Sequence, residues 1–167
     1  MKNTGAEIHS MAGDFDSAKG DFRKFSVRAG NRLFPDYQKV PDFVNQLCLE
    51  LNQKLRSTKE KSISEIYDLS FDAHFQLVFI HPFADGNGRT SRLLMNYIQA
   101  FYDLPLTLIY TENRLEYFNA LEKTKEEENP TIFRQFMQQQ LVKFFENELK
   151  LLTSKTIKKN KGFTFVF

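Results

Sequence analysis

Apolar residues recur at spacings of three and four over most of the chain, a pattern that is typical of amphipathic helices. Segment Ile63–Ile80 is apolar on most sides near its end, so it is expected to form the central buried element, as one or two helices. The preceding helix is expected to face the core through a stripe made of Phe43, Val44, Leu47, Cys48 and Leu51. Together the spacings predict helices over residues 40–55, 63–80, 112–123 and 131–152. The fold class is therefore expected to be mainly α.

The amino-terminal segments break this helical pattern. Residues 1–21 mix Gly, Ser, Asp and Lys and predict only a short helical turn around Glu7 to Met11. Between Phe22 and Pro35, apolar residues flank Gly30-Asn31, which favours a β-hairpin with a tight turn.

Charged runs dominate the carboxy-terminal part. Residues 126–130 are expected to form a solvated linker between the last two helices. Residues 150–161 carry five lysines, and residues 162–167 have the composition of a strand. A solvated helix end followed by a closing strand is the favoured interpretation, and contact of this basic tail with an acidic partner is the alternative.

Composition restricts the class of protein. With 167 residues, 41% of them hydrophobic and 26% charged, the chain is expected to form one soluble domain. Its net charge of +2 gives no reason to expect binding to nucleic acid or to a membrane, and no apolar run is long enough to span a bilayer. The single cysteine, Cys48, excludes a disulfide within the chain and is expected to be a buried thiol. Since no signal peptide is recognised, a cytoplasmic location is expected.

Candidate chemistry is concentrated in the stretch from His81 to Arg92, HPFADGNGRTSR, which lies between two apolar runs. This layout predicts a helix, a loop and a second helix that ends at about Tyr102. Because Pro82 disfavours the α conformation at the preceding residue, His81 is expected to be extended, with its imidazole at the mouth of the loop. His74, within the first helix, is more readily explained as a buried structural histidine than as a catalytic one.

The same stretch has the residue types of a polyphosphate site. Gly86, Asn87 and Gly88 permit dihedral angles at which several backbone N–H groups point at one anion, next to the start of a helix. Two guanidinium groups, Arg89 and Arg92, fall on one face of that helix and suit separate phosphate groups. The carboxylate of Asp85 completes the set, since a carboxylate beside phosphates is a usual way to hold Mg²⁺.

These residues match the motif of the Fic protein family, H-x-F-x-[D/E]-G-N-G-R-x-x-R, at each specified position, so the chain resembles that family. The resemblance extends from about Ile8 to the last helix and implies a Fic-type helical bundle with a small β-hairpin flap over the active-site loop. In one domain spanning residues 1–167, the flap corresponds to about 22–35, the core helices to about 40–152 and the tail to 153–167. An open alternative is that the chain lacks an N-terminal helix.

The activity that the resemblance implies is transfer of AMP from ATP to a Ser, Thr or Tyr hydroxyl of a target protein, with release of pyrophosphate. His81 is expected to act as general base in this reaction, and Phe83 is expected to anchor the loop that aims it. Asp85 is expected to hold Mg²⁺ against the phosphates. The remaining phosphate contacts come from Gly86, Asn87, Gly88, Arg89 and Arg92, which stabilise the charge that develops at phosphorus.

Two further groups of residues take their expected roles from the same resemblance. Tyr117 and Phe118 lie in an R-x-x-Y-[Y/F]-x-A-L pattern that begins at Arg114, and they correspond to an aromatic pair beside the adenosine. The flap is expected to align the target protein by pairing with it as an added strand, through Val27, Arg28, Ala29 and Gly30.

Three alternatives remain at the level of the sequence. A Fic-fold enzyme can use another phosphate-containing donor or remove a modification, and a nucleotide-binding interaction module needs no activity at all. The intact Gly-Asn-Gly and His81 favour AMP transfer. Control is also open: the inhibitory pattern of the family that the chain resembles, [S/T]-x-x-x-E-[G/N], is matched only at Thr124–Asn129 and is interpreted as chance there, so inhibition by a separate protein is an alternative. The target and the oligomeric state are not predicted.

Overall fold

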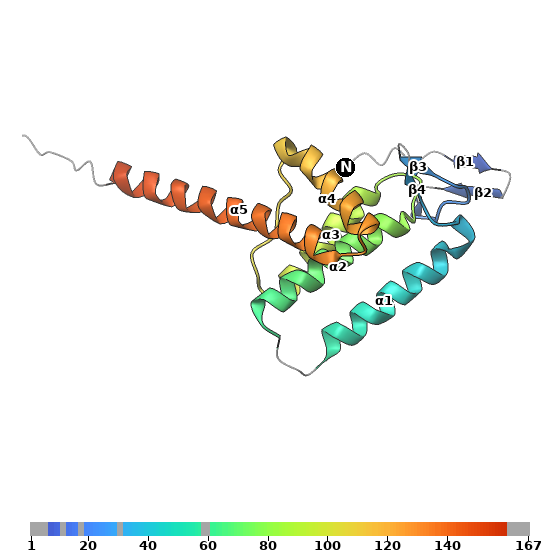
Figure 1. The fold of residues 1–167 in the computed structure, drawn as a ribbon, viewed down its shortest axis with the longest axis horizontal. Helices are drawn as coiled ribbons and strands as arrows, with labels where there is room; N and C mark the ends of the chain where they lie inside the picture. The colour runs from blue at the N-terminus through green and yellow to red at the C-terminus, as the bar shows by residue number, and fades with distance from the viewer. Residues whose placement is uncertain (1–6, 11–12, 17–18, 30–31, 58–60, 160–167) are drawn as a thin grey trace, which may run out of the picture. The chain divides into compact units, whose positions relative to one another are not determined.

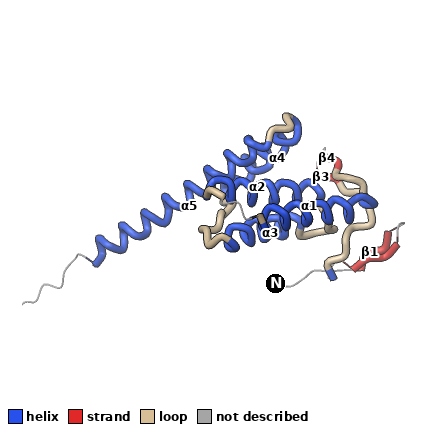
Figure 2. Tube along the Cα trace, turned by 90° about the horizontal axis from the view of Figure 1, so that it is seen from below, coloured by secondary structure: helices blue, strands red, loops and turns tan. Residues whose placement is uncertain are grey.

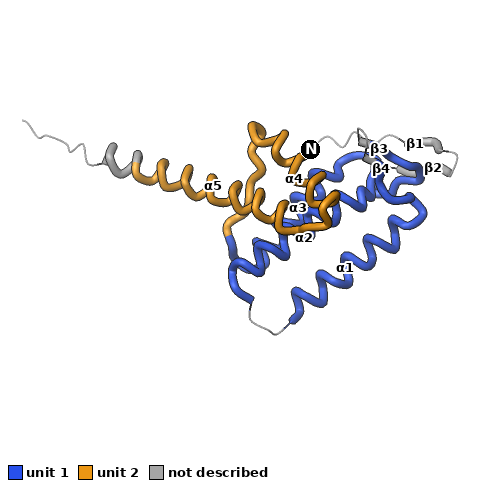
Figure 3. Tube along the Cα trace, in the orientation of Figure 1, with its two compact units in different colours: residues 1–104 blue, residues 105–167 orange. Residues whose placement is uncertain are grey.

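Helices form most of the computed structural model, which describes residues 7–10, 13–16, 19–29, 32–57 and 61–159 (Figures 1 and 2). The chain divides into two compact units, residues 1–104 and 105–167, which are distinguished by colour in Figure 3. Each unit contains helices at the positions that the apolar periodicity predicts. The mainly helical fold class is therefore confirmed.

The first unit is built on three helices: α1 (Val40–Arg56), α2 (Ile63–Ile80) and α3 (Asn87–Phe101). Helix α2 packs against both α1 and α3, which makes it the central element of this unit, as predicted. Its start is defined by a capping box, in which the Glu65 backbone N–H donates to Ser62 Oγ at 3.2 Å and the Ser62 N–H donates to Glu65 Oε2 at 2.8 Å. The helix that carries His81 at its end is therefore stabilised at its other end by local sequence.

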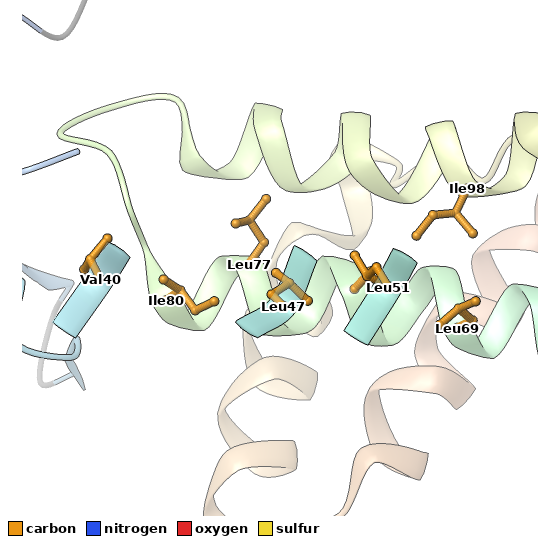
Figure 4. Packing of buried hydrophobic residues seen from close by; sticks show 8 residues of the cluster. Val40, Leu47, Leu51, Leu69, Leu77, Ile80 and Ile98 are labelled. Atoms are coloured by element: carbon orange, nitrogen blue, oxygen red, sulfur yellow. The ribbon is translucent and has the colours of Figure 1, made fainter. Parts of the chain in front are cut away.

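The core of this unit lies between α1, α2 and α3 (Figure 4). Its buried members are Val40, Leu47, Leu51, Leu69, Ala73, Leu77, Ile80 and Ile98. Figure 4 shows Leu47 of α1 beside Leu77 of α2, with Leu51 further along toward Leu69 and Ile98. Leu77 and Ile80 belong to the last turn of α2, so the residues immediately before the candidate loop are fixed by apolar packing.

The stripe predicted on α1 is wider than the face that is buried. Cys48 is exposed, and Phe43 keeps 37% of its surface exposed, whereas Leu47 and Leu51 are buried. Of this stripe, Val44 packs against the core together with Leu47 and Leu51, so the buried face of α1 is narrower than predicted and leaves out Phe43 and Cys48. The expectation of a buried Cys48 thiol was therefore wrong.

The amino-terminal segment forms strands rather than a helical turn. Strand β1 (Glu7–Ser10) pairs antiparallel with β2 (Gly13–Asp16), in the register Ile8 opposite Phe15. Two strands that pair within ten residues satisfy their backbone groups with each other, which the short turn predicted at residues 7–11 does not do. The helical turn was therefore a wrong prediction.

The hairpin predicted over residues 22–35 is reduced to one short pair of strands. Strand β3 (Arg28–Ala29) pairs antiparallel with β4 (Arg32–Leu33), and Arg28 lies opposite Leu33. Gly30, assigned to the same segment, lies outside the described residues. After β4, the 3₁₀ helix η2 (Tyr37–Lys39) leads into α1, and the Asp36 side chain caps it by accepting from Gln38 N–H at 3.0 Å.

The second unit pairs α4 (Arg114–Glu126) with α5 (Pro130–Lys159), and a 3₁₀ helix, η3 (Thr111–Asn113), precedes α4. Its buried residues include Tyr117, Leu121, Phe133, Phe136 and Met137. Helix α4 begins two residues later than predicted and α5 extends beyond Leu152, while residues 160–167 of the predicted tail lie outside the described residues. In the part of the chain that the structure describes, no helix combines the length and apolar character needed to cross a membrane.

Candidate active site

His81 ends α2 in the left-handed region, with φ 50° and ψ 58°. Its backbone N–H still donates to the Leu77 carbonyl at 3.1 Å, so the residue closes the last turn of the helix. The left-handed conformation avoids the clash that Pro82 creates in the right-handed α region, and Pro82 itself is buried. Helix α2 therefore ends where the sequence predicts, but the extended conformation expected for His81 was wrong.

The His81 imidazole is held by contacts on two sides. The Phe34 ring, which directly follows β4, stacks on it with ring centroids 3.9 Å apart. Its Nδ1 lies 3.4 Å from the Val78 carbonyl oxygen. Because a carbonyl only accepts a hydrogen bond, this contact favours the tautomer with the proton on Nδ1, in which Nε2 carries the lone pair. The arrangement provides an oriented proton acceptor at the loop.

Arg23 lies in the segment that the sequence assigns to the flap, about 22–35, but the sequence gives this residue no role of its own. Only 1% of its surface is exposed, and its guanidinium donates to three backbone carbonyls: His81 at 2.7 Å, Phe25 at 2.8 Å and Pro35 at 2.6 Å. Burial lowers the pKa of Arg23, an effect that the negative charge of Asp36 partly offsets. The sequence signal for this residue is weak, because a single arginine in a polar segment is usually solvated.

The Asn87 side chain binds the backbone of the loop between α2 and α3. Its Oδ1 accepts from the Phe83 backbone N–H at 2.9 Å, its Nδ2 donates to the Phe83 carbonyl at 2.8 Å, and the residue is buried. Phe83 is half-buried and its ring lies 5.8 Å from that of Phe22. The sequence expectation placed the Asn87 amide at the reacting phosphorus, whereas in this structure both polar atoms of that amide bind the backbone of Phe83.

The anion-binding character of the loop comes from the start of α3. Gly86 precedes this helix with φ 85°, and no side chain caps the N–H groups of its first turn. A 15-residue helix with an uncapped N-terminus presents several N–H donors and the positive end of its dipole. Gly88, in contrast, is helical, so the left-handed conformation expected in this run belongs to Gly86 alone among its glycines.

Arg89 and Asp85, which were assigned to phosphate and metal, pair with each other. Arg89 Nη2 lies 3.0 Å from Asp85 Oδ2, and the two side chains are 53% and 79% exposed. An exposed pair of this kind contributes about 1 kcal/mol or less, so a phosphate or a cation can replace either partner at little cost. Within the described residues no cluster of three or more His, Cys, Asp and Glu side chains forms a metal site. A lone carboxylate fits Mg²⁺ only where phosphate oxygens and water complete its shell.

The charge of Arg92 acts on a buried histidine, His74. His74 is inaccessible to solvent, and its pKa is lowered to about 4, mainly by burial and further by the charge of Arg92, against a hydrogen bond to the Ser91 backbone that raises it. The imidazole of His74 is therefore neutral at neutral pH. Complete burial and a neutral ring favour the structural interpretation of His74 over a catalytic one.

Tyr117 and Phe118 belong to the second unit and differ in their surroundings. The Tyr117 ring is buried, 6.1 Å from each of the rings of Phe133 and Phe136, as expected of a core residue. Phe118 is 46% exposed, and the Arg114 guanidinium lies 5.7 Å from its ring centroid. The role of this pair beside an adenosine stays a prediction.

Gly86→Ala is expected to lower the free energy of unfolding by about 1–2 kcal/mol, because an L-residue is strained at φ 85°. Gly88→Ala is the matched control, since Gly88 is helical and alanine favours a helix by about 1 kcal/mol over glycine. In both variants the added Cβ meets an arginine side chain at 3.4 Å, so the backbone conformation is the main difference. Urea denaturation measures both, and equal effects of the two substitutions would contradict the left-handed role of Gly86.

Comparison with known proteins agrees with this geometry. The sequence profile of the Fic/DOC family matches residues 3–99. The protein adenylyltransferase Fic of Drosophila erecta is 34% identical over 124 residues, which cover 72% of this chain and 24% of that protein. The chain thus spans about a quarter of the length of the curated relatives it matches.

Solved structures show the same fold. A Fic-domain-containing signalling protein from Bacteroides thetaiotaomicron has a TM-score of 0.64 at 24% identity, covering 74% of this chain and 52% of its own. Fic-1 from C. elegans has a TM-score of 0.65 at 24% identity, covering 81% of this chain and 38% of its own. The motif, the profile match and the fold lead to one conclusion: this chain belongs to the Fic/DOC family.

Proposed function

We propose that this chain transfers AMP from ATP to a hydroxyl side chain of a target protein and releases pyrophosphate. The observation that carries the proposal is the loop between α2 and α3, where an oriented imidazole, an uncapped helix N-terminus and two arginines fall within twelve residues. The relatives named protein adenylyltransferase Fic, at 34% identity over 72% of the chain, support the same reaction.

His81 acts on the target rather than on the nucleotide. Its Nε2 accepts the proton of the target hydroxyl, while the hydroxyl oxygen forms a bond to the α-phosphorus of ATP. The bond from the α-phosphorus to the bridging oxygen breaks, and that oxygen leaves with pyrophosphate. The tautomer favoured by the Val78 carbonyl places the lone pair on Nε2, and the stacking of Phe34 orients the ring for this step.

The phosphates bind at the start of α3. The backbone N–H groups of Gly86, Asn87 and Gly88 stabilise the charge that develops on the α-phosphate and on the leaving oxygen. Arg89 and Arg92 bind the outer phosphates as charge-assisted donors. The Asn87 side chain contributes indirectly, because its bonds to Phe83 hold the loop in the shape that presents these groups.

Asp85 is the residue that would hold Mg²⁺. Its carboxylate is largely exposed and its partner, Arg89, is exchangeable, which fits a cation whose shell is completed by phosphate oxygens and water. When bound, Mg²⁺ supplies neutralisation of the negative charge on the phosphates.

The target chain docks on the flap in this proposal. Strands β3 and β4 provide an edge for an added strand; Arg28 and Ala29 form β3, and Val27 directly precedes it. Phe34, which directly follows β4, stacks on the imidazole, so the residue next to the flap strands contacts the base. Pairing through the backbone does not depend on the side chains of the target, so it does not restrict the target sequence. The distance from the flap to His81 then determines which hydroxyl reacts.

Arg92→Ala is expected to weaken binding of ATP by roughly 10- to 150-fold and binding of ADP less, because a charge-assisted contact to the outermost phosphate contributes roughly 1.5–3 kcal/mol. Isothermal titration with both nucleotides measures this difference. Equal losses for ATP and ADP would place Arg92 away from the γ-phosphate.

Labelled ATP tests the reaction itself. The protein is incubated with ATP labelled at the α-phosphate and, in parallel, at the γ-phosphate, and self-modification is followed on a denaturing gel. AMP transfer retains the α label on protein and releases the γ label as pyrophosphate. Retention of the γ label would instead identify a phosphate transferase and contradict the proposal.

A further inference from the structure

Arg23 connects the segment that docks the target to the residue that acts on it. We propose that Arg23 is a positioning residue, which aligns the His81 imidazole with strands β3 and β4 and so sets where a docked hydroxyl meets the base. This inference rests on the proposed function, because it assigns Arg23 a part in the same step. It concerns a side chain that touches neither nucleotide nor target.

Arginine side chains are rarely buried as completely as that of Arg23. A guanidinium with 1% of its surface exposed has lost nearly all of its hydration, and the groups that receive its hydrogen bonds are neutral carbonyls. Asp36 acts only through its charge on the pKa of Arg23. An apolar side chain of similar length fills the same space without that desolvation. Unlike an apolar side chain, the guanidinium fixes the positions of the three carbonyl groups that it binds.

Three donors on one rigid plane fix three backbone positions relative to one another. Nε donates to the His81 carbonyl, Nη1 to that of Phe25 and Nη2 to that of Pro35. The Arg23 backbone N–H adds a fourth bond, to the Pro82 carbonyl at 2.9 Å. Phe25 precedes β3 and Pro35 follows β4 in the sequence. Arg23 therefore binds the chain on both sides of the two strands proposed to dock the target, and it joins them to His81 at the end of α2.

The same geometry controls the imidazole in two ways. The bond to the His81 carbonyl holds the left-handed backbone from which the ring projects. The bond to Pro35 holds the residue next to Phe34, whose ring stacks on the imidazole. Removing Arg23 releases both constraints at once. Since a displacement of about 1 Å of a reacting group can cost on the order of 100-fold in rate, the loss appears in catalysis.

The test compares Arg23→Met with Arg56→Met, which removes an exposed arginine at the end of α1. Arg23→Met is expected to lower kcat for AMP transfer by about tenfold to 100-fold, with the KM for ATP unchanged within about twofold, because the phosphate donors are untouched. Arg56→Met is expected to match the wild type. A KM for ATP that rises in step with the fall in kcat would overturn the inference.

A second readout does not depend on activity. In protein carrying isotope-labelled histidine, the Phe34 ring current shifts the His81 ring protons, and His81→Ala identifies their signals. Phe34→Leu gives the position of an unstacked imidazole. Arg23→Met is expected to move the His81 signals toward that position and to leave those of buried His74 in place as a marker of the fold. Unchanged His81 signals in a folded Arg23→Met protein would overturn the inference.

A milder substitution keeps the test decisive if the His74 signals show that Arg23→Met does not fold. Arg23→Lys retains the charge and replaces the planar fork by a single ammonium, so an intermediate shift of the His81 signals and an intermediate kcat are expected. Wild-type values for both would overturn the inference. If the wild type transfers no AMP, the proposed function fails, whereas the histidine signals still decide whether Arg23 positions the imidazole.

Discussion

His81→Ala is expected to lower the rate of AMP transfer by about 10²- to 10⁴-fold, the usual contribution of a positioned general base. Binding of ATP is expected to stay close to that of the wild type, because the imidazole acts on the target hydroxyl and the phosphates are bound by α3 and its arginines. Rates come from incorporation of α-labelled ATP, and affinities come from calorimetric titration.

The matched control for this variant is His9→Ala, which removes an imidazole from strand β1 and is expected to leave the rate unchanged. A large loss of ATP affinity in His81→Ala would mean that the imidazole contacts the nucleotide. Full transfer activity in His81→Ala would remove His81 from the chemistry altogether.

Asn87→Ala is expected to lower both stability and catalysis. The variant loses two hydrogen bonds and leaves the Phe83 N–H and carbonyl without their partner, which costs about 2 kcal/mol of unfolding free energy. The released loop misplaces the start of α3, and transfer is expected to fall about 100-fold. Urea denaturation and the labelled-ATP assay measure the two effects.

These two effects also separate the two roles considered for Asn87. If its amide acted on the reacting phosphorus and its bonds to Phe83 contributed no stability, Asn87→Ala would slow transfer and leave the free energy of unfolding near that of the wild type. Because the amide holds the loop, both quantities are expected to fall together. Asn45→Ala, on the exposed face of α1, is the control and is expected to change neither.

The helices and the candidate loop were predictable because their determinants are local. The apolar spacing before His81 defines α2, Pro82 ends it, and Gly86 provides the left-handed residue before α3. The twelve residues that carry the proposed chemistry are contiguous. For this reason the sequence alone predicted which side chains gather at the loop, although it did not predict the left-handed backbone of His81.

What the sequence did not predict depends on contacts between distant segments. Arg23 is 58 positions from the His81 carbonyl that it binds. Phe34 stacks on the imidazole only because the fold brings the end of α2 back to the residue that follows β4. Cys48 is exposed because one neighbouring helix covers a narrower face of α1 than its apolar stripe suggests. The pairing of β1 with β2 likewise depends on backbone partners, which a helical spacing rule does not consider.

The most direct measurement is mass spectrometry of the acceptor after incubation with ATP, together with assay of released pyrophosphate. The account predicts an addition of the mass of one AMP on a Ser, Thr or Tyr side chain, one pyrophosphate released for each addition, and no addition with His81→Ala. An addition of phosphate alone, or an AMP adduct that forms equally well with His81→Ala, would contradict it.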